Sequence, residues 1–324
     1  MEKAFLVSIL VPVYGVEQYI ERCARSLFEQ TFSSIEYIFV DDCSPDNSID
    51  LLKQVISYYP ERKDAIKIIH HDKNRGLAGA RNTAIDAATA DFVVHVDSDD
   101  YIELNCIELL VKKQQETGAD IVSSGILCHK GNNTIEWPPS NDKNSYNYSL
   151  RLIERVTSVN IWGRLIRRSL YINNCLRVDE KTNMGEDYQI IPRLVWYADK
   201  IASIDNCLYH YIYANANSYT DSFTIDKDRQ AWKSFLILEE FFRDKGHDCV
   251  KALELGKLNL IYGSIISCLT TNNNYYYREV RSLIKGCSSK SIRRLPFAKR
   301  IIMKIPNYKL LKLLVDLFMY CKKK

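Results

Sequence analysis

The stretch Asp91-Phe92-Val93-Val94-His95-Val96, followed directly by Asp97-Ser98-Asp99-Asp100, gives the first indication of the fold. Its first part is short, largely apolar and rich in valine, which is typical of a buried strand. The three carboxylates that follow repel one another, and they are costly to hold away from water unless a cation shares the site. Oxygen ligands suit Mg2+ and Mn2+. The pattern therefore indicates either a divalent metal site at a strand end or a solvated turn that caps the next helix.

The composition of the chain bounds its class. Of its 324 residues, 46% are hydrophobic and 26% are charged, which fits a globular protein with one α/β domain and a second part. Ten cysteines occur without a C-x-x-C pair, so free thiols in a reducing cytoplasm fit better than a zinc site or a disulfide framework. We expect no membrane span, because no apolar run approaches about 18 residues. The N-terminus lacks a small-residue cleavage site and reads as a first strand.

Residues 5–128 alternate strand and helix patterns, and the segments between the expected strands carry apolar residues at helical spacing. This order predicts an α/β fold with a mostly parallel sheet that helices cover on both faces. Residues 129–149 are polar and read as a loop, whereas residues 224–285 look helical. The expected strands are Phe5–Val13, Tyr37–Val40, Ile66–Ile69, Phe92–Val96 and Ile121–Leu127.

Polar residues follow four of the expected strands, and ligands of parallel α/β sheets bind at the carboxyl ends of strands. Each residue also has a purely structural explanation. Tyr14 could pack at a strand end or stack on a base, and Asp42 could cap a helix or accept a hydrogen bond from a base. Arg81 could be solvated, or it could pair with the acids or with a diphosphate. Together the four ends favour a crevice for a charged ligand; they are Pro12–Gly15, Asp41–Ser44, Asp72 with Asn74–Gly76, and Asp97–Asp100.

Two common motifs are excluded. A calcium-binding loop that starts at Asp97 would need glycine at its sixth position, which is Ile102. The chain also contains no G-x-G-x-x-G sequence, so a dinucleotide-binding Rossmann site is unsupported.

Four linked motifs resemble the successive signatures of the family 2 glycosyltransferases with the GT-A fold, a Rossmann-like α/β fold. Their order and spacing match over about the first 130 residues. The chain departs from the family at Gly15, where Asn is usual, and at Cys43, where Gly is usual. The four motifs are Ser8–Tyr14 (SILVPVY), Val40–Ser44 (VDDCS), Asn74–Asn82 (NRGLAGARN) and Asp97–Asp100 (DSDD).

The resemblance assigns roles by position. Asp99 would be the favoured direct ligand of Mn2+ or Mg2+, with Asp97 as second ligand and Asp100 as a helper. Tyr209-His210-Tyr211 resembles a segment near the donor diphosphate, so His210 is a further candidate ligand, although an ordinary packed histidine explains it equally well. Pro12 and Tyr14 would line the base and ribose, and Asp42 would contact the base. The expected donor-binding residues are Pro12, Tyr14, Asp42, Asn74, Arg81, Asp97 and Ser98.

The second half supplies a candidate base. Met184-Gly185-Glu186-Asp187-Tyr188 resembles the acidic motif of the family, in which the Asp is the general base. Asp187 is therefore the predicted base, with Glu186 beside it in the catalytic pair. The alternative is a helix start stabilised by acids. Trp162-Gly163-Arg164-Leu165 resembles a Trp-x-Lys-Leu segment, with Arg164 in place of Lys.

The resemblance implies an inverting glycosyltransferase that moves a sugar from a nucleotide-diphosphate sugar, most simply UDP-linked, to a hydroxyl of a glycan or lipid-linked acceptor in surface polysaccharide biosynthesis. It implies a GT-A domain over 1–223, with a donor half at 1–128 and an acceptor half at 150–223, and a helical region at 224–324. Two alternatives stay open. The absence of a Gly-rich, Lys-containing phosphate loop near the start weakens a sugar-phosphate nucleotidyltransferase, and the presence of both Asp97-Ser98-Asp99 and Glu186-Asp187 argues against a non-catalytic nucleotide-sugar-binding module. No nucleic acid partner is expected.

The basic charge of the chain lies in its tail. Residues 290–324 hold eleven Lys or Arg and one acid, Asp316. The whole chain carries +4 and this segment +10, so residues 1–289 carry −6. Such a basic amphipathic stretch indicates contact with an anionic membrane surface, and packing on the acidic body is the alternative. We expect a cytoplasmic protein, peripheral at the inner face of the cell membrane. The apolar positions at helical spacing are Leu310, Leu313, Leu314, Leu317 and Cys321.

Overall fold

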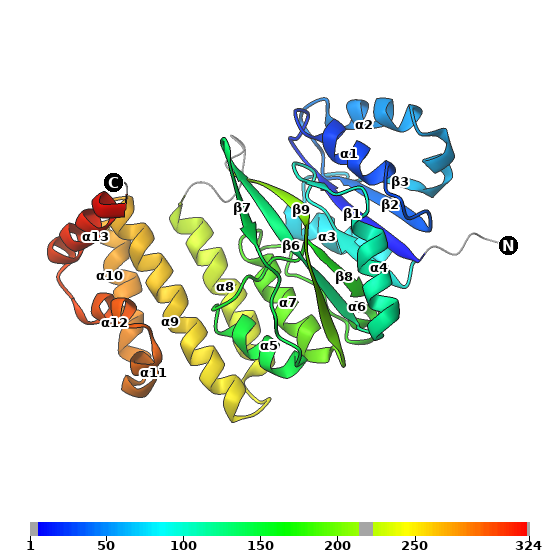
Figure 1. The fold of residues 1–324 in the computed structure, drawn as a ribbon. Coiled ribbons are helices and arrows are strands. Elements are labelled where there is room, and N and C mark those ends of the chain that lie inside the picture. The colour runs from blue at the N-terminus through cyan, green and yellow to red at the C-terminus, as the bar shows by residue number, and fades with distance from the viewer. Residues whose placement is uncertain (1–5, 214–222, 323–324) are drawn as a thin grey trace. The chain divides into compact units, whose positions relative to one another are not determined.

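The computed structural model describes residues 6–213 and 223–322, with side chains as far as Leu317, and its residue contacts divide the chain into two compact units. The first unit comprises Met1–Ser149 and Asn160–Asp221, and the second comprises Leu150–Val159 and Ser222–Lys324. In Figure 1 the first unit is a sheet with helices and the second consists of helices. The segment expected as an acceptor half, 150–223, is thus shared between the units.

One mixed sheet forms the first unit, in the order β3-β2-β1-β4-β8-β6-β9-β5, with β7 paired to β6. The pairs of β1 with β2 and β4, of β2 with β3, and of β6 with β9 are parallel. Strands β5, β7 and β8 add antiparallel pairs. The bounds are β1 Val7–Val13, β2 Ile35–Asp41, β3 Ile66–His70, β4 Phe92–His95, β5 Tyr101–Ile102, β6 Ile121–Lys130, β7 Asn133–Trp137, β8 Arg164–Arg167 and β9 Ile201–Tyr213.

The predicted α/β fold is confirmed, and the parallel strands β1 to β4 fall where the sequence analysis expects strands, although Phe5 lies outside the described residues. All residues of β1 and β4 are buried, as their apolar runs require. Helix α3 packs on β1 and β2, and α4 packs on β6 and β9. The helices are α1 Ile20–Phe28, α2 Ser48–Ser57, α3 Gly76–Ala87, α4 Cys106–Thr117, α5 Ser145–Ile153, α6 Ser169–Asn173 and α7 Glu186–Tyr197, with a 3-10 turn η1 at Pro60–Ala65.

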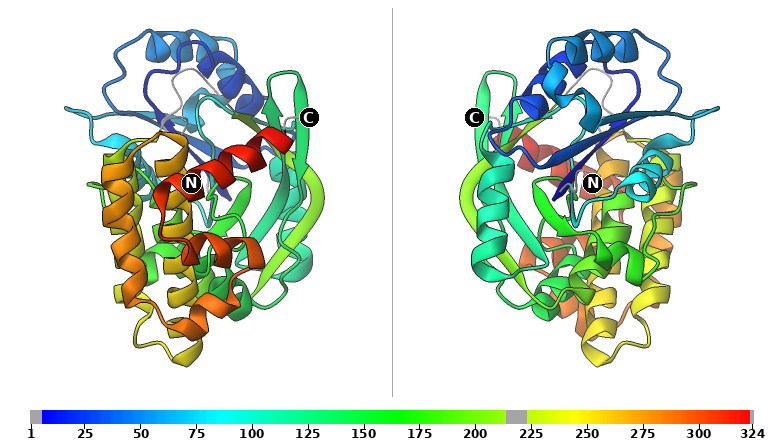
Figure 2. Two further views of the ribbon diagram at one scale, coloured as in Figure 1. Left: turned by 90° about the vertical axis from the view of Figure 1, so that its left-hand side faces the viewer. Right: turned by 90° about the vertical axis from the view of Figure 1, so that its right-hand side faces the viewer.

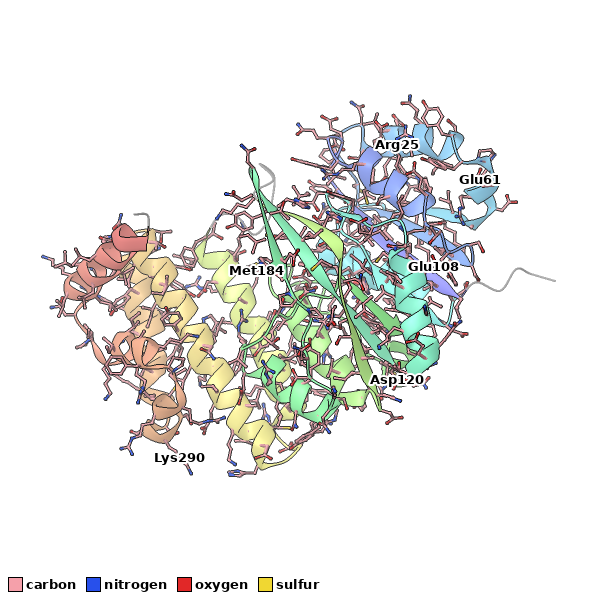
Figure 3. All side chains as sticks on the ribbon, viewed as in Figure 1. Arg25, Glu61, Glu108, Asp120, Met184 and Lys290 are labelled. Carbon is pink, nitrogen blue, oxygen red and sulfur yellow. The ribbon has the colours of Figure 1, made fainter. Side chains whose placement is uncertain are left out.

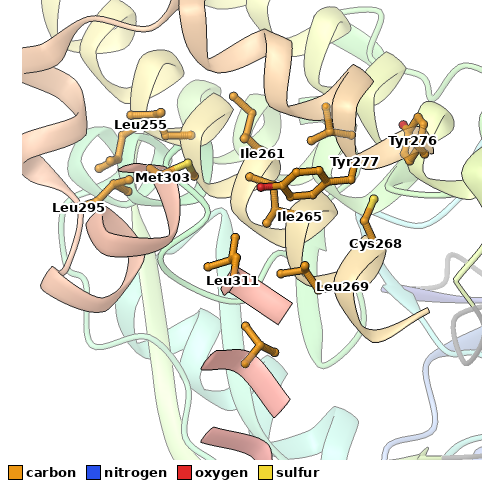
Figure 4. Packing of buried hydrophobic residues seen from close by; sticks show 13 residues of the cluster. Leu255, Ile261, Ile265, Cys268, Leu269, Tyr276, Tyr277, Leu295, Met303 and Leu311 are labelled. Carbon is orange, nitrogen blue, oxygen red and sulfur yellow. The ribbon is translucent and has the colours of Figure 1, made fainter. Parts of the chain in front are cut away.

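The predicted helical C-terminal region is also confirmed. Helix α9 is its centre, since α8, α10, α11, α12 and α13 all contact it. Figure 4 shows Ile261, Ile265 and Leu269 of α9 packed with Tyr277 and Leu311 in its core. The bounds are α8 Ile225–Phe242, α9 His247–Thr270, α10 Asn274–Ser282, η2 Leu283–Gly286, α11 Ser289–Arg294, α12 Phe297–Lys304 and α13 Tyr308–Lys322.

Helix α9 is long and apolar enough, by length and composition alone, to cross a membrane, and it is the one such helix among the described residues. This differs from the sequence expectation, because Glu254 and Lys257 interrupt the apolar run of this helix. Of its apolar 18-residue stretch, 67% is buried inside the structure. Packing in the core of the second unit therefore accounts for its apolar character.

Candidate active site

Arg81, in α3, lies at the centre of a buried ion cluster. Its Nη2 donates to Asp97 Oδ1 at 2.9 Å, and its Nη1 donates to Glu186 Oε1 at 2.8 Å and to Asp187 Oδ1. The Arg81 side chain is only 5% exposed. Of the two explanations open for Arg81, the structure shows a charge partner of the acids. One guanidinium thus joins the carboxylate that follows β4 to the two carboxylates that begin α7.

One face of α3 holds the segment that leads into α7, where Met184 is labelled in Figure 3. The contacts recur every three or four residues along the helix, so they lie on one side of it. Gly76, the first residue of α3, has φ +77°, and a Cβ there would clash with the Asn183 side-chain amide. Any other residue would therefore meet an unfavourable left-handed backbone and push the Asn183 side chain aside. The contacts along this face join Arg75 to Glu180, Ala78 to Asn183, Asn82 to Val178 and Asp86 to Arg177.

Three carboxylates share the charge of one guanidinium, so they do not all ionise readily. Burial and then the charge of Asp187 raise the pKa of Glu186 to about 8. Burial also raises the pKa of Asp187, which Arg81 partly offsets. Burial lowers the pKa of Arg81, but Asp187, Asp97 and Glu186 outweigh it and keep the guanidinium charged. At neutral pH we therefore expect Glu186 to carry a proton.

The residues after β4 divide into two groups. Asp100 is buried, and its carboxylate accepts hydrogen bonds from the Tyr209 hydroxyl at 2.7 Å and the Ile212 N–H at 2.8 Å. Asp100 therefore anchors the loop to β9 and does not act as the helper expected beside a metal. Ser98 is also buried, whereas Asp97 and Asp99 are partly exposed. Only these last two carboxylates are placed to meet a ligand.

Asp97 and Asp99 fit a hard divalent cation by donor chemistry, because both offer carboxylate oxygens on a partly open strand end. Over 6–213 and 223–322, no group of three or more His, Cys, Asp or Glu side chains forms a complete metal cluster. Magnesium sites of this kind draw their remaining ligands from substrate phosphates and water. A pair of carboxylates is thus sufficient for a metal that arrives with its nucleotide.

His210 is engaged elsewhere. Its Nε2 lies 2.8 Å from Glu103 Oε1, its Nδ1 lies 2.8 Å from His129 Nε2, and its ring stacks on Tyr101 at 4.0 Å. Both ring nitrogens already have partners, so neither is available beside Asp99. We therefore leave His210 out of the candidate metal site and assign it to the packing of β9 against β5.

Asp42 shapes the loop before α3. Its Oδ1 accepts from the Arg75 N–H and its Oδ2 from the Gly76 N–H, both at 2.7 Å, and His71 Nδ1 lies 2.7 Å from Oδ1. Its side chain is only 4% exposed. The expected hydrogen bond to a nucleotide base would thus be the fourth on a carboxylate that already bonds to His71, Arg75 and Gly76. Next to it, Cys43 has φ +58, the backbone region that favours the Gly usual at this position.

The other expected donor-binding residues lie at the same edge of the sheet. Pro12 is buried and pairs with Val40 of the neighbouring strand, whereas Tyr14 is 52% exposed. Asn74 is exposed, and its side-chain oxygen accepts from the Gly76 N–H at 3.1 Å. Tyr14 therefore offers a ring to a ligand, while Asn74 supports the start of α3.

Arg164 is structural. It is buried, and it donates to Ser123 Oγ at 2.7 Å and to the Asn160 carbonyl at 2.8 Å. These bonds secure the turn whose Ile161 N–H donates to Asp187 Oδ2 at 3.3 Å. Sequence reasoning missed this contact with Ile161, because a backbone donor leaves no signal in residue type.

Comparisons with known proteins identify the family of this chain. The model of the family "Glycosyl transferase family 2" matches residues 8–174, more than half of the chain. The chain belongs to this family. It is 33% identical over 223 residues to EpsJ of Bacillus subtilis, described as an uncharacterized glycosyltransferase. That match covers 67% of this chain and 63% of EpsJ, so the chain spans less than two thirds of this relative.

Solved structures show the same GT-A-like fold. S. aureus TarS superposes with a TM-score of 0.64 at 20% identity, over 91% of this chain and 50% of TarS. Its residues 1–349, solved with UDP-GlcNAc, give 0.58 at 19% identity, over 88% and 93% of the two chains. The mannosyltransferase PcManGT from Pyrobaculum calidifontis, solved with GDP-Man and Mn2+, gives 0.56 at 16% identity, over 98% and 88%. The family match and the shared fold thus agree that this protein is a family 2 glycosyltransferase.

Proposed function

We propose that this glycosyltransferase moves a sugar from a UDP-linked donor to an acceptor hydroxyl with inversion at the anomeric carbon. The observation that carries the proposal is the bridge that Arg81 makes from Asp97 to Asp187. It brings a donor-side carboxylate and a candidate base into one site. The UDP-GlcNAc bound to TarS supports a UDP-linked donor.

Asp187 is the proposed general base. Both of its oxygens are held, one by Arg81 and the other by the Ile161 N–H, and its side chain remains 18% exposed. Its orientation is therefore fixed before an acceptor binds. Its raised pKa makes the ionised carboxylate a stronger base toward the acceptor hydroxyl. Attack from the side opposite the leaving group inverts the sugar, and no covalent enzyme intermediate is required.

Glu186 is the proposed partner of this base. Its Oε1 accepts from the same Arg81 nitrogen, so Glu186 and Asp187 compete for one positive charge. A proton on Glu186 resolves that competition and leaves the guanidinium to Asp97 and Asp187. Glu186 thus acts as a positioning residue, because its protonation leaves the charge of Arg81 to Asp187.

Asp97 and Asp99 would hold Mn2+ or Mg2+ on the donor side. When bound there, the cation would offset the negative charge of the diphosphate leaving group. Tyr14 provides an exposed ring for the nucleotide, and the loop that Asp42 fixes forms the adjoining wall. The acceptor would be a glycan or a lipid-linked saccharide. No observation favours a nucleotidyltransferase or a non-catalytic module.

A donor screen tests the proposal. The full chain is incubated with UDP-glucose, UDP-galactose, UDP-GlcNAc or GDP-mannose in the presence of Mn2+, and free nucleotide is measured. We expect at least one UDP-sugar to release UDP. We also expect EDTA to stop the release and added Mn2+ or Mg2+ to restore it. If EDTA left UDP release unchanged, the metal would be removed from the proposal. If only GDP-mannose released its nucleotide, the assignment of a UDP-linked donor would be overturned.

A further inference from the structure

Helix α13 is divided lengthwise between a buried and an exposed apolar face. Leu311 and Val315 are 1% and 9% exposed and belong to the core around α9, where Figure 4 labels Leu311. The other face points away from that core. At about 100° per residue, its four leucines fall within an arc of about 100°. They are Leu310, Leu313, Leu314 and Leu317, which are 49%, 58%, 43% and 53% exposed.

Helix α12 continues this pattern. Phe297 is 70% exposed and Ile301 is 38% exposed, whereas Met303 is buried in the core. Lys304 follows Phe297 by seven residues and Ile301 by three, so the three side chains share one side of α12. The left view of Figure 2 shows α12 and α13 on the same side of the second unit. We call their exposed residues the leucine–lysine surface: Phe297, Ile301, Lys304, Lys309, Leu310, Leu313, Leu314 and Leu317.

Exposed cations lie on α11, α12 and α13. Lys304 and Lys309 are exposed, and neither has an acidic partner among the residues that the structure describes. Lys290, labelled in Figure 3, and Arg293 add two more exposed cations on α11. Asp316, the sole acid in 290–324, is paired with Lys312 at 3.3 Å. The surface therefore combines a row of large apolar side chains with two lysines, Lys304 and Lys309, that have no acidic partner among the described residues.

We propose that the leucine–lysine surface lies on an anionic lipid bilayer. Leucines would enter the boundary between headgroups and acyl chains, and the lysines would meet lipid phosphates. A second copy of the chain is a weaker fit, because pairing would bring two +10 segments together. The sequence left packing and membrane contact as alternatives for the tail. In this proposal one face of α13 packs on the core and the other face contacts the membrane. Cys321, the last position of the expected stripe, lies outside the described side chains.

This inference stands apart from the proposed function, because all of its residues lie in the second unit. If both hold, an enzyme resting on lipid would suit an acceptor that is itself carried on lipid. Membrane binding and UDP release are measured separately, so a failure of one leaves the other testable.

Vesicle sedimentation of the full chain tests the proposal. Phosphatidylglycerol-containing vesicles are compared with vesicles of phosphatidylcholine alone, and we expect at least about tenfold tighter binding to the anionic ones. Replacing the four exposed leucines by Gln should weaken binding at least about tenfold. The double change Lys304→Glu and Lys309→Glu should weaken it by more than about fivefold per residue, since each lysine near such a surface contributes about 1 kcal/mol and each Glu adds repulsion.

The matched control replaces two leucines that are equally exposed but lie elsewhere, Leu104→Gln and Leu236→Gln, at 51% and 55% exposure. It should bind vesicles as the wild type does. Circular dichroism should show that every variant is folded. Equal vesicle binding by the four-leucine variant and the wild type would overturn the proposal. So would a wild-type dimer that binds no vesicles and that the four-leucine change converts to a monomer, because the surface would then be a contact between copies.

Discussion

Arg81 carries the candidate site, because a single guanidinium faces three carboxylates that it alone draws together. The Asn74–Asn82 motif predicted that Arg81 is a site residue, and pairing with acids was one of its two explanations. The sequence could not predict which acids Arg81 pairs with, since Glu186 lies 105 residues away in sequence. For Asp100 and His210 the residue type alone suggests the wrong role. Both could bind a metal, but Asp100 bonds to Tyr209 and His210 bonds to Glu103, so both serve the packing of the fold.

Removing Arg81 should be costly. Arg81→Gln leaves buried carboxylates without their cation and should lower the free energy of unfolding by about 3–5 kcal/mol at pH 7. The loss should be smaller at pH 5, because the unpaired acids then take up protons. Urea unfolding at both pH values measures the effect. The control is Arg177→Gln. It breaks an exposed ion pair with Asp86, which lies on α3 as Arg81 does, and it should lower the free energy of unfolding by only about 0–1 kcal/mol. Equal losses in the two variants would refute the central role of Arg81.

Glu186 should make stability depend on pH. Its folded-state pKa of about 8 lies above the ordinary value of 4.5, so the folded chain binds the proton more tightly than the unfolded chain. Its contribution to stability is therefore complete below pH 4.5 and is lost as the pH rises through about 8. The stability of the wild type relative to Glu186→Gln should fall between pH 5 and pH 8. A difference that stays constant over that range in urea unfolding would show that Glu186 does not hold a proton.

The start of α3 depends on a glycine. Gly76→Ala meets both a left-handed backbone and the Asn183 side chain, so it should displace the segment that leads to Asp187. Gly131→Ala is the matched control, because it has φ +57 but no atom within 4 Å of the new Cβ. The control should cost only the backbone term of about 1–2 kcal/mol. Gly76→Ala should cost more than this in urea unfolding and also slow UDP release. Equal costs with normal turnover would show that the close approach of Asn183 is unimportant.

The strands predicted from sequence are short segments dominated by apolar residues. They correspond to β1, β2, β3, β4 and the start of β6, although Lys67 interrupts β3 and Ser123–Gly125 interrupts β6. β7 lies in the segment 129–149, which the sequence predicts as a loop because it is polar and contains Pro138-Pro139; all residues of β7 are exposed, Ile135 and Trp137 included. β9 was missed because Asp205-Asn206 interrupts a strand that nonetheless pairs with β6 and β5. Tertiary pairing overrides local pattern in both cases.

The chain as a whole separates opposite charges along its length, with +10 in residues 290–324 and −6 before them. If the leucine–lysine surface meets anionic lipid through charge, vesicle binding should weaken as salt rises, because the Debye length shrinks from about 10 Å at 0.1 M to about 3 Å at 1 M. The Lys304→Glu and Lys309→Glu variant should show a shallower dependence on salt. Binding that salt leaves unchanged would contradict a role for these charges.

Donor binding and turnover in Asp187→Asn, measured with the UDP-sugar that the wild type uses, test the central claim most directly. Asn keeps the shape of the side chain but cannot accept the acceptor proton. We predict turnover lowered about 100- to 10,000-fold, with donor affinity close to that of the wild type. Asp99→Asn should instead weaken donor binding, and Asp50→Asn, whose side chain is 84% exposed on α2, should change neither. Wild-type turnover by folded Asp187→Asn would contradict the assignment of Asp187 as the base.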